Sequence, residues 1–294
     1  MSDPHRVVPE TGIVADRTSL VWVDGPDAVS FLEGLLSQGI GAMRPGAGAR
    51  SLLLAPNGKL RALLWVLRDE DRIGLLCDAG VLDAVLGDLR RFKIRVEVEI
   101  SAETERVWEV WGPAAAAVTD HDGSDVLRVG ESGLVAPYPL QRSPLPRFVV
   151  IGAKPQAPVM SPAMVEMVRI EHGEAVVGID LDDKVIPQEA IDTATAVDFT
   201  KGCYLGQELV ARIDSRGHVN RRLMGFVFAG SEEPPAGSDI VHEDRVVGRL
   251  TSVTRSEQVG GAIGLGMLRT EVGAERAITA EGIRGRASEL PIRS

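Results

Sequence analysis

The chain has 294 residues, of which 44% are hydrophobic and 25% charged, and its net charge is −10. This length and composition are typical of a globular protein with two or three domains, and the acidic balance disfavours direct binding to nucleic acid or to an anionic membrane. Two cysteines are too few for a disulfide framework and suit a reducing compartment. No run of about 20 apolar residues could cross a bilayer. The N-terminal segment 1–12 does not resemble a signal peptide, so we expect a cytoplasmic protein.

The first third of the chain reads as an α+β unit with mostly antiparallel pairing. Asn57 and Gly58 stand between two apolar runs and are a strong hairpin signal. Towards the end of this part, residues 93–100 alternate between apolar and acidic side chains, as a strand with one buried face does. The pattern predicts, in order, strand 18–24, helix 24–39, strands 51–55, 59–68 and 73–78, helix 81–92 and strand 93–100.

A second α+β stretch follows, and the chain then becomes all-β. Ser161 predicts a helix N-cap with Pro162 at the first position, and Gly173 can end that helix. Residues 179–200 show no convincing regular element and read as a long loop. After Gly217 only short strands and turns are visible, which indicates a small β-barrel or sandwich. The remaining expected elements are strand 108–112, helix 113–120 and strands 125–130, 133–139 and 147–152.

Cys203 stands in the motif KGCYLGQE, which opens a segment with helical spacing. At or near a helix N-terminus, and two residues from Lys201, the pKa of its thiol would be lowered towards neutrality. Gly202 and Gly206 leave the backbone open to a ligand. A free cysteine more often packs as a small apolar residue, and the local features leave both interpretations open. Cys77, in an apolar run, is predicted to be a core residue.

The motif RIEHG at 169–173 places Glu171 near a helix end. Its carboxylate could accept two parallel N–H groups from a flat heterocycle such as a pterin. Arg169 and Glu171 could equally be solvated charges on a helix surface. One cysteine cannot hold an iron–sulfur cluster, and the scattered histidines lack zinc-binding spacing, so we predict no metal site.

Together these motifs resemble the YgfZ-type proteins, folate-binding relatives of the glycine-cleavage aminomethyltransferase. RIEHG, then IPQEA, then KGCYLGQE, then ARIDSRGHVNRRL stand in the family's order, and the resemblance is dense over residues 165–225. It implies two ferredoxin-like α+β halves around a central folate channel, plus a C-terminal all-β barrel. The corresponding domains are 1–222, in which 51–134 is one half inserted in the other, and 223–294.

The resemblance also implies a function. Such a protein would bind tetrahydrofolate and assist the assembly or repair of iron–sulfur enzymes, and would thereby support tRNA modification indirectly. Its partners would be iron–sulfur client or assembly proteins, not nucleic acid or a membrane. Cys203 would be the functional thiol, and the folate site would include Glu171. The other residues expected in that site are Arg169, Lys201, Gly202, Tyr204 and Gln207.

One departure separates the chain from the aminomethyltransferases, which are similar but carry a pair of aspartates after an early hairpin. At the matching place, residues 59–63 read Lys-Leu-Arg-Ala-Leu. A neutral alkyl group cannot handle a proton or stabilise charge, so ordinary glycine cleavage is disfavoured. Two alternatives stay open beside the accessory role: a folate-dependent transferase or demethylase acting on a small amine, and an interaction module without folate. The resemblance implies that the protein is not a conventional enzyme, and any enzymatic activity would be a tetrahydrofolate-dependent one-carbon transfer.

Overall fold

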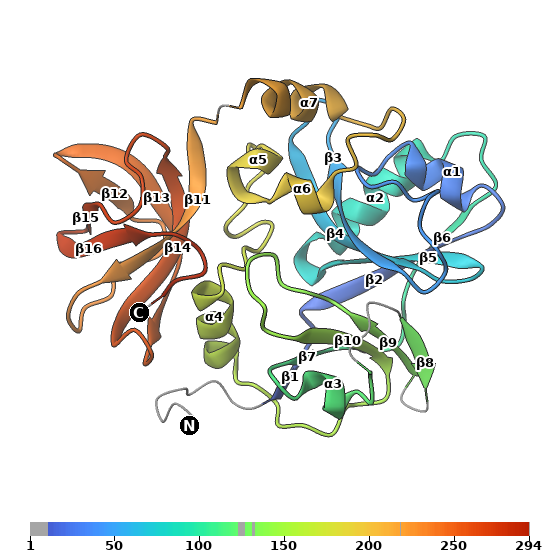
Figure 1. Ribbon diagram of the computed structural model, residues 1–294, viewed down its shortest axis with the longest axis horizontal. Coiled ribbons are helices and arrows are strands. Elements are labelled where there is room, and N and C mark those ends of the chain that lie inside the picture. The colour runs from blue at the N-terminus through green and yellow to red at the C-terminus, as the bar shows by residue number, and fades with distance from the viewer. Residues whose placement is uncertain (1–10, 123–126, 131–132, 218, 294) are drawn as a thin grey trace.

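The computed structural model describes residues 11–122, 127–130, 133–217 and 219–293, and it contains two antiparallel sheets and a closed barrel (Figure 1). One five-stranded sheet has the spatial order β1 (Gly12–Ala15), β7 (Val107–Trp111), β10 (Arg147–Gly152), β9 (Gly133–Pro137) and β8 (Arg128–Gly130). The other has the order β3 (Gly48–Leu54), β4 (Leu60–Arg68), β5 (Arg72–Asp78), β2 (Thr18–Asp24) and β6 (Glu99–Ala102). The α+β class predicted for this part is confirmed.

The predicted C-terminal β-structure is confirmed as a six-stranded closed barrel. Its apolar interior is filled by side chains such as Phe226, Phe228 and Leu250, all at most 1% exposed. Around the barrel run β11 (Arg221–Phe228), β14 (Gly261–Arg269), β13 (Arg245–Ser256), β12 (Asp239–His242), β15 (Ala277–Ala280) and β16 (Ile283–Ser288).

The two sheets pack face to face, and helices cover their outer faces. Apolar side chains alternate along the strands, so Leu20 and Trp22 of the second sheet meet Val149 and Ile151 of the first. Each such side chain contributes about 1.5–3 kcal/mol when fully buried. Helices α1 (Ala28–Glu33) and α2 (Leu82–Phe92) cover the second sheet, and α3 (Ala115–Val118) covers the first.

The second sheet interrupts the first along the chain. Its strands run from Thr18 to Ala102 and lie between β1 and β7 in sequence. The first barrel strand begins at Arg221. The domain limits of 1–222, 51–134 and 223–294 are not tested by these elements and stay predictions. Of the strand predicted at 125–130, residues 125 and 126 lie outside the described residues.

The barrel is joined to the sheets through helices. Helix α4 (Pro162–Glu171) packs against β13 and β14, and the short helices α5 (Pro187–Ala190) and α6 (Thr193–Ala196) pack against β11 and β3. Figure 1 shows α4 beside the barrel and α7 (Gln207–Arg216) along the top of the view. Helices α5 and α6 lie between these two helices in the same view. Within the described part of the chain, each helix is too short or too polar to cross a bilayer.

Two predicted elements are shorter in the structure than the sequence pattern suggests. The helix expected at 24–39 is only α1, because the chain turns after Gly34 and Leu36 pairs with Leu53 of β3. The strand expected at 93–100 begins only at Glu99. Before it, Arg95 has a φ of 56° in the left-handed region, which interrupts an extended strand.

The long segment 179–200, predicted to lack regular structure, contains α5 and α6. Pro187 occupies the first turn of α5, where its missing N–H costs nothing. The carboxylate of Asp192 caps α6 by accepting the N–H of Ala194 at 3.1 Å. Each helix has four residues, which is too short for an amphipathic period to be visible in the sequence.

Candidate functional site

Cys203 is exposed, in the loop between α6 and α7. The Leu205 N–H next to it donates to the Gly34 carbonyl at 3.1 Å. Gly206 has a φ of 78°, and a Cβ there would lie 2.5 Å from the Ala55 carbonyl oxygen, so only glycine lets this loop rest on the β3–β4 turn. The thiol is therefore reachable and stands on a loop that is fixed on both sides. Cys77, by contrast, is fully buried in β5, as predicted.

The ammonium group of Lys201 is directed to the end of α1. Its Nζ donates to the carbonyl oxygens of Glu33, Leu36 and Gln38, each at 2.8 Å, and lies 3.4 Å from the Glu33 carboxylate. Burial lowers the pKa of Lys201, and Glu33 partly offsets this. These bonds hold the thiol loop against α1, so we assign Lys201 a positioning role. Direct contact of Lys201 with a folate stays a prediction.

The other residues of the KGCYLGQE motif shape the same loop. The Gln207 side-chain oxygen accepts the Tyr204 N–H at 3.0 Å, which orders the turn that enters α7. The Tyr204 ring is partly buried against the apolar cluster under α5 and α6, and burial raises its pKa to about 12. A Cβ on Gly202 would have no neighbour within 4 Å, so the backbone beside Cys203 is open.

Glu171 ends α4 and borders a pocket of about 480 Å³. Its Oε1 accepts the Ser256 hydroxyl of β13, and burial raises its pKa, partly offset by that hydrogen bond. Among the described residues, Oε2 has no hydrogen-bond partner. A buried carboxylate with one free oxygen in a pocket fits the donor pair of a pterin. The pocket is lined mainly by Pro113, Ser143, Pro144, His172, Gln258 and Ile292.

Arg169, whose contact with the cofactor stays a prediction, lies in an ionic network between α4 and the barrel. Its side chain is 1% exposed and lies 2.8 Å from the Asp180 carboxylate. It also donates to Ser252 of β13 at 2.6 Å and pairs with Glu166 one turn earlier in α4. Every side of the guanidinium is therefore engaged within the protein, so we assign it the role of holding α4, and with it Glu171, against the barrel.

The predicted site residues thus form two groups. Lys201, Cys203 and Gln207 belong to the thiol loop before α7, whereas Arg169 and Glu171 belong to the end of α4. The residues that line the Glu171 pocket include none from 201–207. Figure 1 shows α7 at the top of the view and α4 below it, beside the barrel. The structure therefore gives a candidate thiol site and a candidate heterocycle site in separate places.

Residues 59–63 follow the β3–β4 turn, at the place where the aminomethyltransferase resemblance would put the aspartates. Here they are basic and apolar, and the two basic side chains bind other residues of the protein. Lys59 donates to the Lys184 carbonyl at 2.7 Å. Arg61 pairs with Asp88 of α2 at 2.9 Å. A group that accepts or donates a proton to a substrate is therefore not supplied by residues 59–63.

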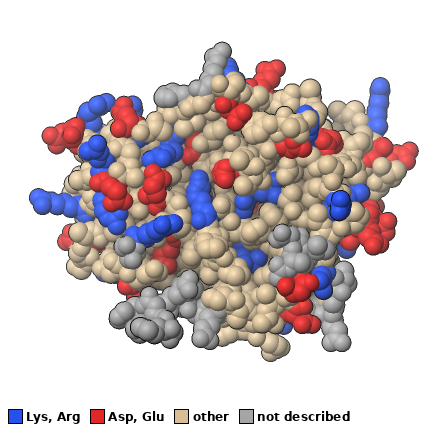
Figure 2. Space-filling model, in the orientation of Figure 1, with Lys and Arg blue, Asp and Glu red and all other residues tan. Residues whose placement is uncertain are grey.

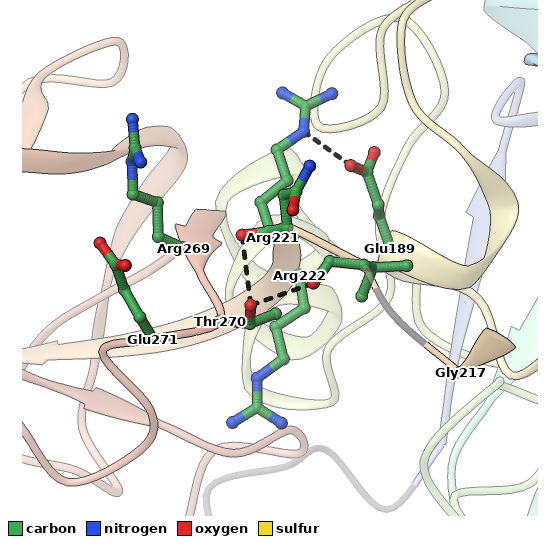
Figure 3. Close-up of a pocket in the computed structure, with 9 residues that line it drawn as sticks. Glu189, Gly217, Arg221, Arg222, Arg269, Thr270 and Glu271 are labelled. Carbon is green, nitrogen blue, oxygen red and sulfur yellow. Dashed lines mark hydrogen bonds and ion pairs between the residues drawn. The ribbon is translucent and has the colours of Figure 1, made fainter. Parts of the chain in front are cut away.

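A larger cavity of about 1140 Å³ opens where α7 meets the barrel (Figure 3). Figure 3 shows Arg221 directed towards Glu189 of α5, and the two lie 3.1 Å apart. The Thr270 hydroxyl donates to the Val219 carbonyl at 3.0 Å. The cavity holds charges of both signs, and acidic and basic side chains are also interspersed over the face in Figure 2. The mixed charges of the cavity and of this face do not indicate a binding surface for a polyanion such as a nucleic acid.

Several residues of these sites were not predicted from the sequence. Ser256 binds Glu171 across 85 positions, and Asp180 binds Ser252 across 72. The sequence around a serine or an aspartate in a loop or strand does not show which distant residue its side chain will bind. Arg50, which is 8% exposed, and the partly buried Arg142 were likewise without a sequence signal.

Comparison with known proteins agrees with this geometry. A family model described as the glycine cleavage T-protein C-terminal barrel domain matches residues 221–292. A "tRNA-modifying protein YgfZ" of Yersinia enterocolitica is 27% identical over 256 residues, covering 79% of this chain and 76% of that protein. An "Iron-sulfur cluster assembly factor IBA57 homolog, mitochondrial" of Chaetomium globosum is 26% identical over 301 residues, covering 92% of this chain. The match spans only 63% of that fungal protein.

The fold has a close solved counterpart. The crystal structure of glycine cleavage system aminomethyltransferase T from Bartonella henselae superposes with a TM-score of 0.81 and 18% sequence identity, and the match covers 96% of this chain and 86% of that one. At this identity the likeness shows the fold alone. By its barrel domain, its YgfZ and IBA57 relatives and its fold, the chain is similar to YgfZ-type proteins and shares the fold of the glycine-cleavage T-protein.

Proposed function

We propose that this protein is a folate-binding accessory factor for the assembly or repair of iron–sulfur enzymes, through which it supports tRNA modification. The single observation that carries the proposal is the exposed thiol of Cys203 on a loop held by Lys201 and Gly206. A reachable thiol can contact a cluster, a persulfide or a partner's cysteine transiently. The names of the YgfZ and IBA57 relatives support this role.

Folate binding is proposed at the pocket of Glu171. The free oxygen of its carboxylate would accept N–H groups of the pterin, while the Ser256 hydroxyl donates to the other oxygen and orients the group. When bound, tetrahydrofolate supplies a carrier for one-carbon groups. Glu171 binds and orients this carrier, and Arg169 fixes the helix that presents Glu171.

A folate-dependent transferase or demethylase is the second candidate, because the fold is that of an aminomethyltransferase. The absence of an acidic residue at 59–63 weighs against it. One-carbon transfer from a small amine to tetrahydrofolate by the purified protein would favour this candidate over the accessory role.

The proposed partners are proteins that carry or deliver iron–sulfur clusters. The net charge of −10 favours such partners over nucleic acid. The two free cysteines fit a reducing compartment, and we place the protein in the cytoplasm, although the fungal relatives are named mitochondrial.

The thiol is tested in a strain that lacks the endogenous gene and carries Cys203→Ala. We expect iron–sulfur enzyme activity and tRNA thiolation to stay as low as in the empty strain. Cys77→Ala, the matched control, keeps the wild-type levels if it folds. Equal activities in the Cys203→Ala and wild-type strains would remove the thiol from the mechanism.

The folate site is tested by calorimetry with tetrahydrofolate. Glu171→Gln keeps the shape of the side chain but offers an N–H where the ligand needs an acceptor, so we expect at least a tenfold loss of affinity, about 1.4 kcal/mol. Glu208→Gln, in the first turn of α7, is the control that leaves affinity unchanged. A wild-type protein that does not bind tetrahydrofolate at millimolar concentration is instead an interaction module without folate.

A further inference from the structure

Two arginines stand directly opposite each other in the cavity between α7 and the barrel. Arg221, the first residue of β11, pairs in register with Arg269, the last residue of β14, and both line the cavity. The side chains of such a pair leave the same face of the sheet, with Cβ atoms about 4.5–5.5 Å apart. Figure 3 shows both guanidinium groups directed to one side of the strands and Arg222 to the other. Because like charges in this position destabilise a sheet, the pair gains stability when an anion joins it.

A buried carboxylate orients one arginine of the pair and leaves its outer edge free. The Glu189 carboxylate accepts the Ile186 N–H at 3.0 Å with one oxygen and the Arg221 Nε–H at 3.1 Å with the other. Among the described residues, no acceptor binds Nη1 or Nη2 of Arg221. The Arg269 side chain is exposed, and its guanidinium forms no hydrogen bond or ion pair with a residue that the structure describes. The two guanidinium groups therefore offer unused donors to the same cavity.

The other charged residues of the cavity have partners elsewhere. Arg222 lies 2.8 Å from Glu289, and Glu271 lies 3.8 Å from Arg245. Of the charged side chains described in this lining, Arg269 is the one without an oppositely charged neighbour. The cavity is thus short of negative charge, although the chain as a whole is acidic. A single anionic group can supply that charge, whereas the mixed charges around it do not suit a polyanion.

Hydrogen bonds fix the backbone from which the two arginines project. The Thr270 N–H donates to the Asn220 carbonyl at 3.0 Å, and the Thr270 hydroxyl donates to the Val219 carbonyl at 3.0 Å. These bonds tie the segment that enters β11 to the residue that follows β14. The arginine pair is therefore held in place before any ligand arrives, which lowers the entropic cost of binding.

The lining of the cavity favours a polar ligand with a tetrahedral anionic group. Among the described lining residues, Val219 is the only apolar side chain and none is aromatic, so a flat heterocycle finds no matching wall. The volume of about 1140 Å³ is larger than one ion needs and leaves room for a polar body. Each guanidinium fork binds a pair of oxygens, and a phosphate has several such pairs whereas a carboxylate has one. Two forks on one anion therefore favour phosphate over carboxylate.

We propose that Arg221 and Arg269 bind a phosphate group in this cavity, carried by a small polar ester or present as free phosphate. Arg221 binds the group through Nη1 and Nη2 while Glu189 holds its Nε, and Arg269 binds it from the neighbouring strand. The site rests on neither Cys203 nor the Glu171 pocket, so it stands or fails independently of the proposed function.

The test is calorimetry of the full chain with three probes. Glycerol 3-phosphate is an ester with a polar body, inorganic phosphate is the group alone, and malonate is a small dicarboxylate. The variants are Arg269→Gln and Arg221→Gln, which remove a charge and keep a side-chain N–H. Arg276→Gln is the matched control, because Arg276 is an exposed barrel arginine outside the cavity lining.

We expect glycerol 3-phosphate to bind the wild-type protein and the control equally, and each of the two variants about tenfold more weakly. Tighter binding of the ester than of inorganic phosphate supports a phosphorylated molecule, and equal binding supports free phosphate as the source. The proposal is overturned if neither phosphate binds at millimolar concentration, if malonate binds more tightly than both, or if the variants bind as well as the wild type.

Thermal unfolding separates a binding role of Arg269 from a packing role. In a buffer without phosphate, the Tm of Arg269→Gln should equal or exceed that of the wild type, because the change removes the like-charge pair. Added phosphate should raise the Tm of the wild type and leave that of Arg269→Gln unchanged, since a ligand stabilises only the state that binds it. A variant that is less stable than the wild type without phosphate would show that Arg269 serves the fold, against the proposal.

Discussion

Replacing Arg169 by Met should destabilise the protein severely, because it would leave a charge buried without its partner. The Asp180 side chain is fully buried, and the Arg169 guanidinium lies 2.8 Å from it. Removing one partner of such a pair costs about 3–5 kcal/mol. Since Asp180 keeps the hydroxyls of Thr251 and Ser252, each at 2.6 Å, we expect a loss near the lower limit, about 3 kcal/mol.

Thermal unfolding at neutral pH measures this loss. At about 2–4 °C per kcal/mol, the Tm should fall by roughly 6–12 °C. Arg245→Met is the control, because Arg245 is 72% exposed and lies 3.8 Å from Glu271, an arrangement worth less than about 1 kcal/mol. The double variant Arg169→Met, Asp180→Asn should recover at least about 1 kcal/mol through coupling. A Tm for Arg169→Met within the range of the control would refute the network as the anchor of α4.

Two further predictions concern buried titratable groups. A chromogenic disulfide reagent should label Cys203 at once in the native protein but Cys77 only after unfolding, because Cys77 is fully buried and burial raises its pKa to about 12; two fast thiols in the native protein would contradict this. Burial raises the pKa of Asp78 from 3.8 to about 6, with Arg17 opposing, so the folded state binds this proton more tightly than the unfolded chain. Its ionisation therefore costs about 3 kcal/mol of stability above that range, a cost that is absent below pH 3.8. The stability of Asp78→Asn relative to wild type, measured by urea unfolding, should rise between these pH values and then level off; a constant difference would show that Asp78 is ionised normally.

Elements set by local chemistry were predictable from the sequence. The hydroxyl of Ser161 accepts the Met164 N–H at 3.2 Å with Pro162 in the first turn, as the cap pattern indicates. The turn at Asn57 and Gly58 joins β3 to β4, and the φ of Gly58 is 79°. In each case the determining contact lies within three residues, so the sequence pattern contains both partners.

Elements set by distant contacts were not predictable. The pattern at 24–39 favours a helix more than twice as long as α1. The carbonyls of Glu33, Leu36 and Gln38 instead accept hydrogen bonds from Lys201, which is 163 to 168 positions away. Arg169 is similar: its position in RIEHG allows a binding role, while its partners Asp180 and Ser252 commit it to packing. A sequence motif identifies a residue type at a site and does not show which way the side chain points.

The thiol loop and the hairpin that lacks the aspartates are parts of one structure, which bears on what this fold does here. A Cβ on Gly58 would lie 2.5 Å from the Cβ of Leu209, and one on Gly206 would lie 2.5 Å from the Ala55 oxygen. The β3–β4 turn therefore supports the backbone that presents Cys203. In this chain the exposed thiol of Cys203 stands on the loop that the hairpin supports, and residues 59–63 after the hairpin include no acidic side chain. The thiol-centred function that we propose therefore needs no change to the scaffold shared with an aminomethyltransferase, because it depends on different side chains.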